Sequence, residues 1–211
     1  MLTVAGTGWV VESELRAGRL GCPGCSGVLA PWGHARDREV RSAKASWWVR
    51  PRRARCPACG VTHVLLPVVC LLRRLYSAPV IMAALVLRAT SGAGWRTIAD
   101  EVGVPGSTVR GWVRRFSARA EMVRVFFTRA ALATGIDMGP PGPAGSPVAD
   151  ALAAVGLLVA AITQRFGPGP GAEAGAGAGS GFVGAVTAWQ VASAASGSRL
   201  LAPGWPGDTP G

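Results

Sequence analysis

The most regular apolar spacing in the chain lies in residues 95–116, which read WRTIADEVGVPGSTVRGWVRRF. Four apolar residues follow the i, i+3, i+4, i+7 spacing of a helix with one buried face: Val109, Trp112, Val113 and Phe116. A second set predicts a first helix over residues 96–102 and the turn after it: Ile98, Ala99, Val102 and Val104. Gly103 can adopt the left-handed conformation that ends a helix, Pro105 cannot continue one, and Ser107 is a good N-cap. The pattern predicts a helix-turn-helix unit whose second helix covers residues 107–118.

The second predicted helix turns its basic side chains away from its apolar side. Arginines on such a face can donate to guanine edges and to backbone phosphates, and the small Gly111 leaves room for a close approach. We therefore expect these residues to contact duplex DNA: Arg96, Ser107, Thr108, Arg110, Arg114 and Arg115. The alternative is an ordinary helical hairpin with a solvated charged face.

Further elements flank this unit. Residues 80–90 predict a preceding helix with Pro79 in its first turn, and another helix follows Phe116 to about residue 133. A Pro/Gly linker (135–147) leads to an apolar helical region (148–196) with a flexible Gly/Ala/Pro spacer (167–181), and residues 197–211 predict a disordered tail. Two apolar helices alone cannot bury all of their apolar surface. We therefore expect them to pack on the front of the chain or on a second copy of the chain, which would give a homodimer.

Two CxxC pairs, CPGC at residues 22–25 and CPAC at residues 56–59, carry the strongest chemical signal. Two intervening residues let one tight turn offer both sulfurs, and four thiolates are the donor set of a closed structural zinc site. We expect one structural Zn²⁺ ion held by Cys22, Cys25, Cys56 and Cys59. Disulfides or a redox dithiol are the alternatives, which we favour less because nothing indicates export and one active dithiol would not explain two matched pairs.

The segments around the cysteine pairs predict a small β domain. Strand-like pieces at residues 28–33, 38–49 and 61–66 have the layout of a zinc ribbon over residues 21–68. Residues 1–20 predict a short leader, with a strand in residues 4–11 and a helical turn in residues 12–20. Because Cys70 lies in an apolar run, we expect it to be a buried core thiol. We expect the side chains of His34 and His63 to face solvent or to lie in the core, and the alternative for His63 is a place beside the metal.

The loop between the cysteine pairs is basic and rich in tryptophan. Residues 26–55 contain eight Lys or Arg against two acidic residues, a balance of +6. We expect a phosphate-contacting patch made by Arg50, Arg52, Arg53 and Arg55. Because so small a domain has few other apolar groups, we expect one or two of Trp32, Trp47 and Trp48 in its core. The alternative is that these rings are exposed and stack on bases.

The charge balance favours a polyanion as partner of the front of the chain. The 211 residues carry a net charge of +11, with 20 Lys/Arg against 7 Asp/Glu in residues 1–135 and 2 against 4 afterwards. The most apolar run, residues 151–163, is shorter than the ~18–20 residues of a membrane span and predicts a buried helix. Because the N-terminus has no export signal, we expect a cytoplasmic, nucleoid-associated protein.

The segments CPGC, CPACGVTHVLLP and GWRTIADEVGVPGSTVRGWVRRF resemble an actinobacterial family of unknown function that pairs a transposase-like zinc ribbon with a helix-turn-helix. They are also similar to the N-terminal region of insertion-sequence transposases. The resemblance covers about residues 20–135 and implies duplex DNA binding, with the four cysteines as metal ligands. Transposases need three carboxylates on an α/β domain. After residue 135 this chain has four acidic residues outside any strand pattern: Asp137, Asp150, Glu173 and Asp208.

The sequence thus predicts an α+β fold: a zinc ribbon, a three-helix DNA-binding domain over residues 70–134, and a mostly helical, partly disordered C-terminal region. The function that fits best is a zinc-stabilised regulator or transposase-derived protein that reads duplex DNA. We expect no enzymatic activity and no small-molecule substrate, because no paired acid and base, activated nucleophile or phosphate-binding loop is present. Two alternatives stay open: an accessory protein of mobile-element machinery that binds a protein partner, and an RNA-binding zinc-ribbon protein.

Overall fold

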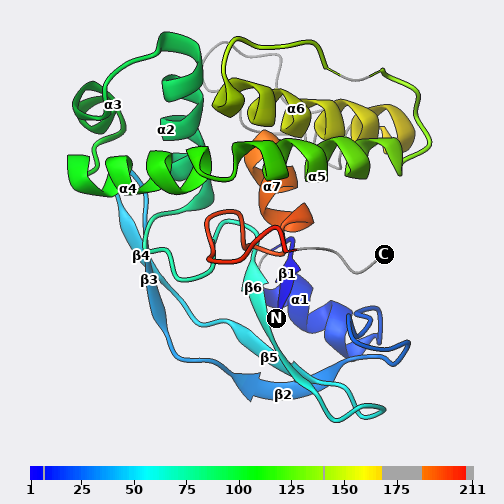
Figure 1. Ribbon diagram of the computed structural model, residues 1–211. Coiled ribbons are helices and arrows are strands. Elements are labelled where there is room, and N and C mark those ends of the chain that lie inside the picture. Colours follow the sequence, from blue (N-terminus) through cyan, green and yellow to red (C-terminus); the bar gives the residue numbers. More distant parts are fainter. Residues whose placement is uncertain (7, 140, 168–186, 208–211) are drawn as a thin grey trace.

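The computed structural model describes residues 1–6, 8–139, 141–167 and 187–207, which form a mixed α+β fold (Figure 1). The strands are β1 (Leu2–Val4), β2 (Ala30–His34), β3 (Arg38–Arg41), β4 (Ser46–Val49), β5 (Arg52–Arg55) and β6 (Thr62–Pro67). The helices are α1 (Gly8–Arg16), α2 (Ala78–Ser91), α3 (Trp95–Val102), α4 (Gly106–Ser117), α5 (Ala120–Leu132), α6 (Pro147–Phe166) and α7 (Ala188–Ala195). The predicted α+β class is confirmed.

The first third of the chain folds around a four-stranded sheet with the strand order β1-β6-β5-β2. β1 runs parallel to β6, whereas β6, β5 and β2 pair antiparallel. α1 buries Val11 and Leu15, which lie four residues apart on one helix face, in the same cluster as Leu29, Ala54 and Leu65. Residues 1–20, expected to be a leader, therefore complete this sheet and its core. Their strand and helix also begin earlier than we expected.

The expectation that one or two tryptophans fill this core is wrong. Trp32, Trp47 and Trp48 are 52%, 36% and 72% exposed. Aliphatic side chains from α1 and the sheet fill the interior instead. The prediction failed because it left α1 out of the domain and so underestimated the aliphatic residues that the domain had for its core.

A two-stranded hairpin, β3–β4, connects the sheet to the helices. In Figure 1 it runs from the sheet region up to α4. The Arg41 amide donates to the Leu75 carbonyl and the Ser77 amide donates to the Arg41 carbonyl, both at 2.9 Å. A Cβ placed on Gly103 would lie 3.3 Å from the Ala43 carbonyl oxygen. The hairpin tip therefore abuts the turn between α3 and α4.

The predicted pair of helices joined by a turn is present. Ile98, Val109 and Phe116 are at most 1% exposed, so both helices bury the apolar faces that the spacing indicates. Gly103 has φ +65° and its amide donates to the Ala99 carbonyl, which ends α3 as expected. The turn places α4 directly against α2 and α3 within one shared core.

The N-cap assignment of α4 was wrong. α4 begins at Gly106 with Pro105 as its N-cap, so Ser107 lies inside the first turn and is exposed. A Cβ on Gly106 would meet the Trp95 ring at 2.5 Å. The Trp95 ring thus lies directly over Gly106. Because the ring leaves no room for a Cβ, the first position of the helix suits a residue without a side chain.

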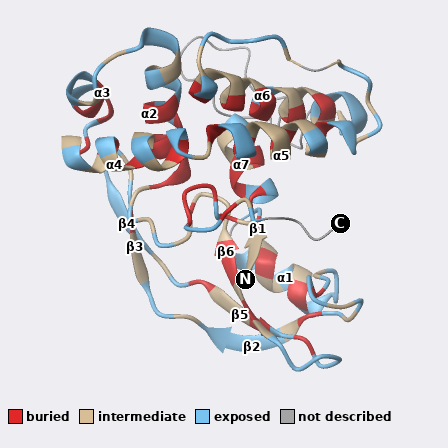
Figure 2. Cartoon of the chain, viewed as in Figure 1, coloured by how far each residue is buried: buried red, intermediate tan, exposed pale blue. Residues whose placement is uncertain are grey.

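α6 is long and apolar enough, by length and composition, to cross a membrane. In the structure it lies beside α5 and contributes six buried residues to the shared core: Val148, Ala151, Ala154, Val155, Leu158 and Ala161. Figure 2 shows the buried sides of α5, α6 and α7 turned toward one another. One side of α6 therefore packs in the shared core, and 39% of its apolar window is buried.

The expected disordered tail is wrong for residues 197–207. Leu201 is 1% exposed, and the Trp205 ring packs edge-on against Phe126 with centroids 5.0 Å apart. Arg74 donates to the Leu201 carbonyl at 2.6 Å, and Arg119 donates to the Ala202 carbonyl. These contacts fix the segment between the helices and the sheet. The predicted spacer lies outside the described residues from residue 168 onward, as do residues 208–211.

Candidate metal centre and basic surfaces

The two CxxC pairs form two similar turns at one end of the sheet. The Cys22 amide donates to the Gly27 carbonyl at 2.8 Å, and the Cys56 amide donates to the Val61 carbonyl at 2.9 Å. Each turn therefore closes five residues after its first cysteine. Gly60, with φ +73°, adopts the left-handed conformation that lets the second turn reverse. The antiparallel pairing of β5 with β2 and β6 brings the turns together.

The four sulfurs of Cys22, Cys25, Cys56 and Cys59 lie within 4.8 Å of one another. Across the two turns, the sulfurs of Cys22 and Cys59 are 3.7 Å apart and those of Cys25 and Cys56 are 3.5 Å apart. A tetrahedral metal with metal–sulfur bonds of about 2.3 Å needs sulfurs about 3.8 Å apart. A disulfide needs about 2.05 Å. The cysteines are free, and their arrangement is compatible with one structural metal ion.

Gly27 is the position that lets the two turns approach. A Cβ at this residue would lie 2.8 Å from the Cys56 sulfur and 2.9 Å from the Ala58 Cβ. The Gly27 amide also donates to the Cys25 sulfur at 3.4 Å. The sequence hinted at this role only through the presence of a glycine soon after each cysteine pair.

The thiols differ in acidity because their surroundings differ. The Cys59 amide donates to the Cys56 sulfur and lowers the pKa of Cys56 to about 7. The Gly27 amide acts in the same direction on Cys25, but the neighbouring thiols and burial outweigh it and raise the pKa of Cys25 to about 12. Metal binding requires all four as thiolates, so it would release protons from this cluster.

The remaining cysteine and the two histidines lie as the sequence suggested. Cys70 is buried in a separate small cluster with Val40 and Leu66. His34 is exposed at the end of β2. His63 is buried, and its Nε2 lies 3.5 Å from the Cys22 sulfur. His63 therefore borders the cysteine cluster without being needed as a fifth donor.

α4 is amphipathic in the way the sequence predicts. Ser107, Arg110 and Arg114 are exposed, whereas Thr108 and Arg115 are half-buried. A Cβ on Gly111 would lie 2.9 Å from an Arg115 guanidinium nitrogen, so the Arg115 side chain folds back along the helix over that glycine. On α3, Arg96 is exposed and stacks on the Trp95 ring at 4.9 Å.

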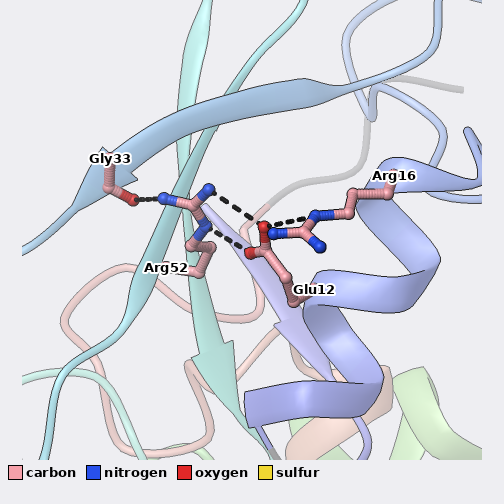
Figure 3. Close-up of polar contacts among 4 residues, drawn as sticks. All are labelled: Glu12, Arg16, Gly33 and Arg52. Atoms are coloured by element: carbon pink, nitrogen blue, oxygen red, sulfur yellow. Dashed lines mark hydrogen bonds and ion pairs between the residues drawn. The ribbon is translucent and has the colours of Figure 1, made fainter.

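Arg50 and the three arginines of β5 do not form one patch, because side chains alternate along a strand. Arg52 points toward α1, where Nε donates to Glu12 at 2.8 Å and Nη1 donates to the Gly33 carbonyl at 2.7 Å (Figure 3). Arg16 also donates to Glu12, at 3.1 Å. Hydrogen bonding from Arg52 lowers the pKa of Glu12. Arg52 thus joins β5 to α1 and β2, which removes it from the expected phosphate-contacting set.

The other three arginines remain at the surface. Arg53 and Arg55 share the face of β5 opposite to Arg52, and the Arg55 guanidinium stacks on the exposed Trp32 ring at 4.9 Å. Arg50 is exposed and lies 3.4 Å from Asp37. Trp9 is 74% exposed on α1, and sequence reasoning missed it. The signal that could have found it is the phase of α1, because the buried Val11 and Leu15 turn Trp9 outward.

A family described as a domain of unknown function, DUF6431, matches residues 22–112. The match begins at the first cysteine of the cluster and ends within α4, so a single family model spans the four cysteines, the β3–β4 hairpin and α3. No curated protein and no solved structure matches the chain. The comparisons therefore associate the cysteine cluster with the start of α4 and name no activity for either.

Proposed function

We propose that this chain is a zinc-stabilised, non-enzymatic protein that binds duplex DNA, with the sheet as a zinc ribbon and α3–α4 as a helix-turn-helix. The observation that carries the proposal is the division of α4 into two faces. Val109, Trp112 and Phe116 are buried, whereas Arg110 and Arg114 are exposed. Residues 106–120 contain four Arg and no acidic residue, so nothing on this helix opposes a phosphate backbone.

The proposed recognition helix is α4. Its first turn presents Ser107 and Thr108, followed by Arg110 and Arg114, in the order in which a helix entering the major groove meets base edges and then phosphates. Arg96 and Arg115 flank this face and suit phosphate contacts. Arg53 and Arg55 on β5 add a second group of basic side chains on the ribbon, where Arg55 is exposed and Arg53 is half-buried.

Zinc is the metal that we assign to the four-cysteine centre. Four thiolates without an open position suit Zn²⁺ and a structural role, so the ion would stabilise the ribbon and take no part in a reaction. Metal analysis of the purified chain should give one zinc per chain. Cys59→Ser should lower that ratio, whereas Cys70→Ser, which removes a buried thiol outside the centre, should leave it unchanged. Equal zinc content in both variants would contradict the assignment.

The likeness to transposase N-termini supports a DNA-targeting role without strand-cleaving chemistry. The family match spans the cysteines and most of the two proposed DNA-binding helices. The proposed identity is therefore a regulator or a transposase-derived targeting protein. The combination of a zinc ribbon and a helix-turn-helix in one chain would offer two basic surfaces to one duplex.

The test is binding to duplexes selected from a random pool at physiological salt, using the zinc-loaded full chain. Arg110→Ala and Arg114→Ala should each weaken the selected duplex by about 1–3 kcal/mol, the range for an arginine that reads a base. Arg129→Ala is the matched control, because it removes an exposed arginine from α5, outside the proposed surface. If all three variants bind alike, α4 is not the recognition helix. A repeated half-site would support the homodimer predicted from the C-terminal helices.

A further inference from the structure

A groove of about 940 Å³ opens between α1 and the end of β4, and no residue of α4 lines it. Its tryptophans are Trp9 from α1 and Trp47 and Trp48 from β4. Arg16 from α1 and Arg50, which follows β4, line it as well. The groove has the volume of a ligand site, and its walls combine flat apolar rings with cations.

Trp9 and Trp48 contribute little to the core, because most of each side chain faces solvent. Trp9 and Trp48 are 74% and 72% exposed, and Trp47 is 36% exposed. Solvent exposure of three large apolar rings around one concavity is unfavourable, because each ring carries about 150–250 Å² of surface that gains from burial. A ligand with flat faces that enters the groove would recover this free energy by stacking on the rings.

The charged groups define the chemistry of that ligand. Glu12, the acid that lines the groove, is already paired with both Arg52 and Arg16 (Figure 3). The Arg16 side chain nevertheless stays 74% exposed, and the Arg50 side chain stays 69% exposed beside Asp37. Exposed ion pairs of this kind contribute little and can be displaced by a stronger anion. The groove therefore offers two accessible guanidinium groups next to three stacking surfaces.

We propose that this groove binds an unpaired stretch of nucleic acid, with bases stacked on Trp9 and Trp48 and phosphates held by Arg16 and Arg50. In a duplex the faces of the bases are covered by their neighbours, so only an unpaired strand can present them to tryptophan. The site uses a different surface from α4 and therefore goes beyond the proposed duplex recognition. A proline-rich peptide could also stack on tryptophan, but the front of the chain, with its charge of +13, favours a polyanion.

The test measures binding of a fluorescein-labelled oligothymidylate of about 12 nucleotides to the full zinc-loaded chain. Trp9→Ala and Trp48→Ala should each raise Kd about 5- to 150-fold, the range for loss of one base–aromatic stack. Trp32→Ala is the matched control, because it removes an exposed tryptophan that does not line the groove. All three replace exposed side chains, so unchanged zinc content and circular dichroism should confirm that each variant is folded. Tryptophan fluorescence should be quenched on binding in the Trp32→Ala variant and much less in the double variant of Trp9 and Trp48.

The same assay separates this site from α4. Arg110→Ala should weaken binding of the selected duplex and leave oligothymidylate binding unchanged. The Trp9 and Trp48 variants should weaken oligothymidylate binding and leave duplex binding unchanged. Equal oligothymidylate affinity in the Trp9, Trp48 and Trp32 variants would overturn the proposal even if duplex binding by α4 were established. Binding of a decaproline peptide that depends on Trp9 and Trp48, without binding of the oligothymidylate, would also overturn it and assign the groove to a protein partner.

Discussion

Replacing Gly27 with alanine should weaken the metal centre more than any other glycine-to-alanine change in the first cysteine turn. The added Cβ would lie 2.8 Å from the Cys56 sulfur and 2.9 Å from the Ala58 Cβ. Both distances are about 1 Å inside the 3.5–4.0 Å of an optimal non-bonded contact. Both neighbours belong to the second cysteine turn, so the side chain can be accommodated only if the two turns separate.

The magnitude follows from the cost of overpacking. One inserted methyl group in a well-packed site costs about 1–3 kcal/mol. Relief of the clash would pull apart the sulfurs of Cys25 and Cys56, which now lie 3.5 Å apart. The substitution therefore destabilises the zinc-bound arrangement of the sulfurs. Zinc affinity should fall about 5- to 150-fold, since 1.4 kcal/mol corresponds to a factor of ten.

The assay is competition for zinc against a chromogenic chelator, together with thermal unfolding of the zinc-loaded chain. Gly24→Ala is the control, because a Cβ there would meet only the Cys22 sulfur at 3.9 Å, an ordinary contact. Gly24→Ala should retain the parent affinity. If Gly27→Ala and Gly24→Ala bind zinc equally tightly and unfold at the same temperature, the close approach of the two turns is not required and the reasoning is refuted.

Two further predictions concern parts of the fold that the sequence did not reveal. Trp205→Ala should lower the free energy of unfolding, measured by urea titration, by about 3–5 kcal/mol, because the Trp205 ring is buried against Phe126. The exposed Trp9 is the control, and Trp9→Ala should change the free energy of unfolding by less than about 0.5 kcal/mol. Equal effects of the two variants would mean that residues 197–207 do not belong to the core. Glu12→Gln should reduce the loss of stability on acidification. The pKa of Glu12 is lowered in the folded state, so its ion pair stabilises the fold above the usual value of 4.5 and this contribution is lost as the pH falls through the folded-state pKa. Thermal unfolding of both proteins between pH 7 and about pH 3 measures this, and parallel curves would contradict it.

Local rules were enough for the parts of this protein in which a residue acts through its neighbours in sequence. The i, i+3, i+4 spacing placed Val109, Trp112 and Phe116 on one face of α4, because helix geometry alone determines which side chains share a face. Gly103 ends α3 because only a residue without a Cβ adopts its left-handed conformation easily. The four-cysteine cluster could be predicted because two intervening residues already bring each pair of sulfurs together.

Contacts between distant segments were decided only by the tertiary structure. Arg52 was expected among phosphate-contacting arginines, but the register of β5 turns it inward to Glu12, forty residues away. Trp47 and Trp48 stay outside because α1, assigned to a leader, supplies the aliphatic core in their place. Residues 197–207 are ordered because Arg74 and Arg119 donate to their carbonyls and the core offers Trp205 a partner. A sequence records local propensity, whereas the identity of each such partner depends on which surfaces meet when the chain folds.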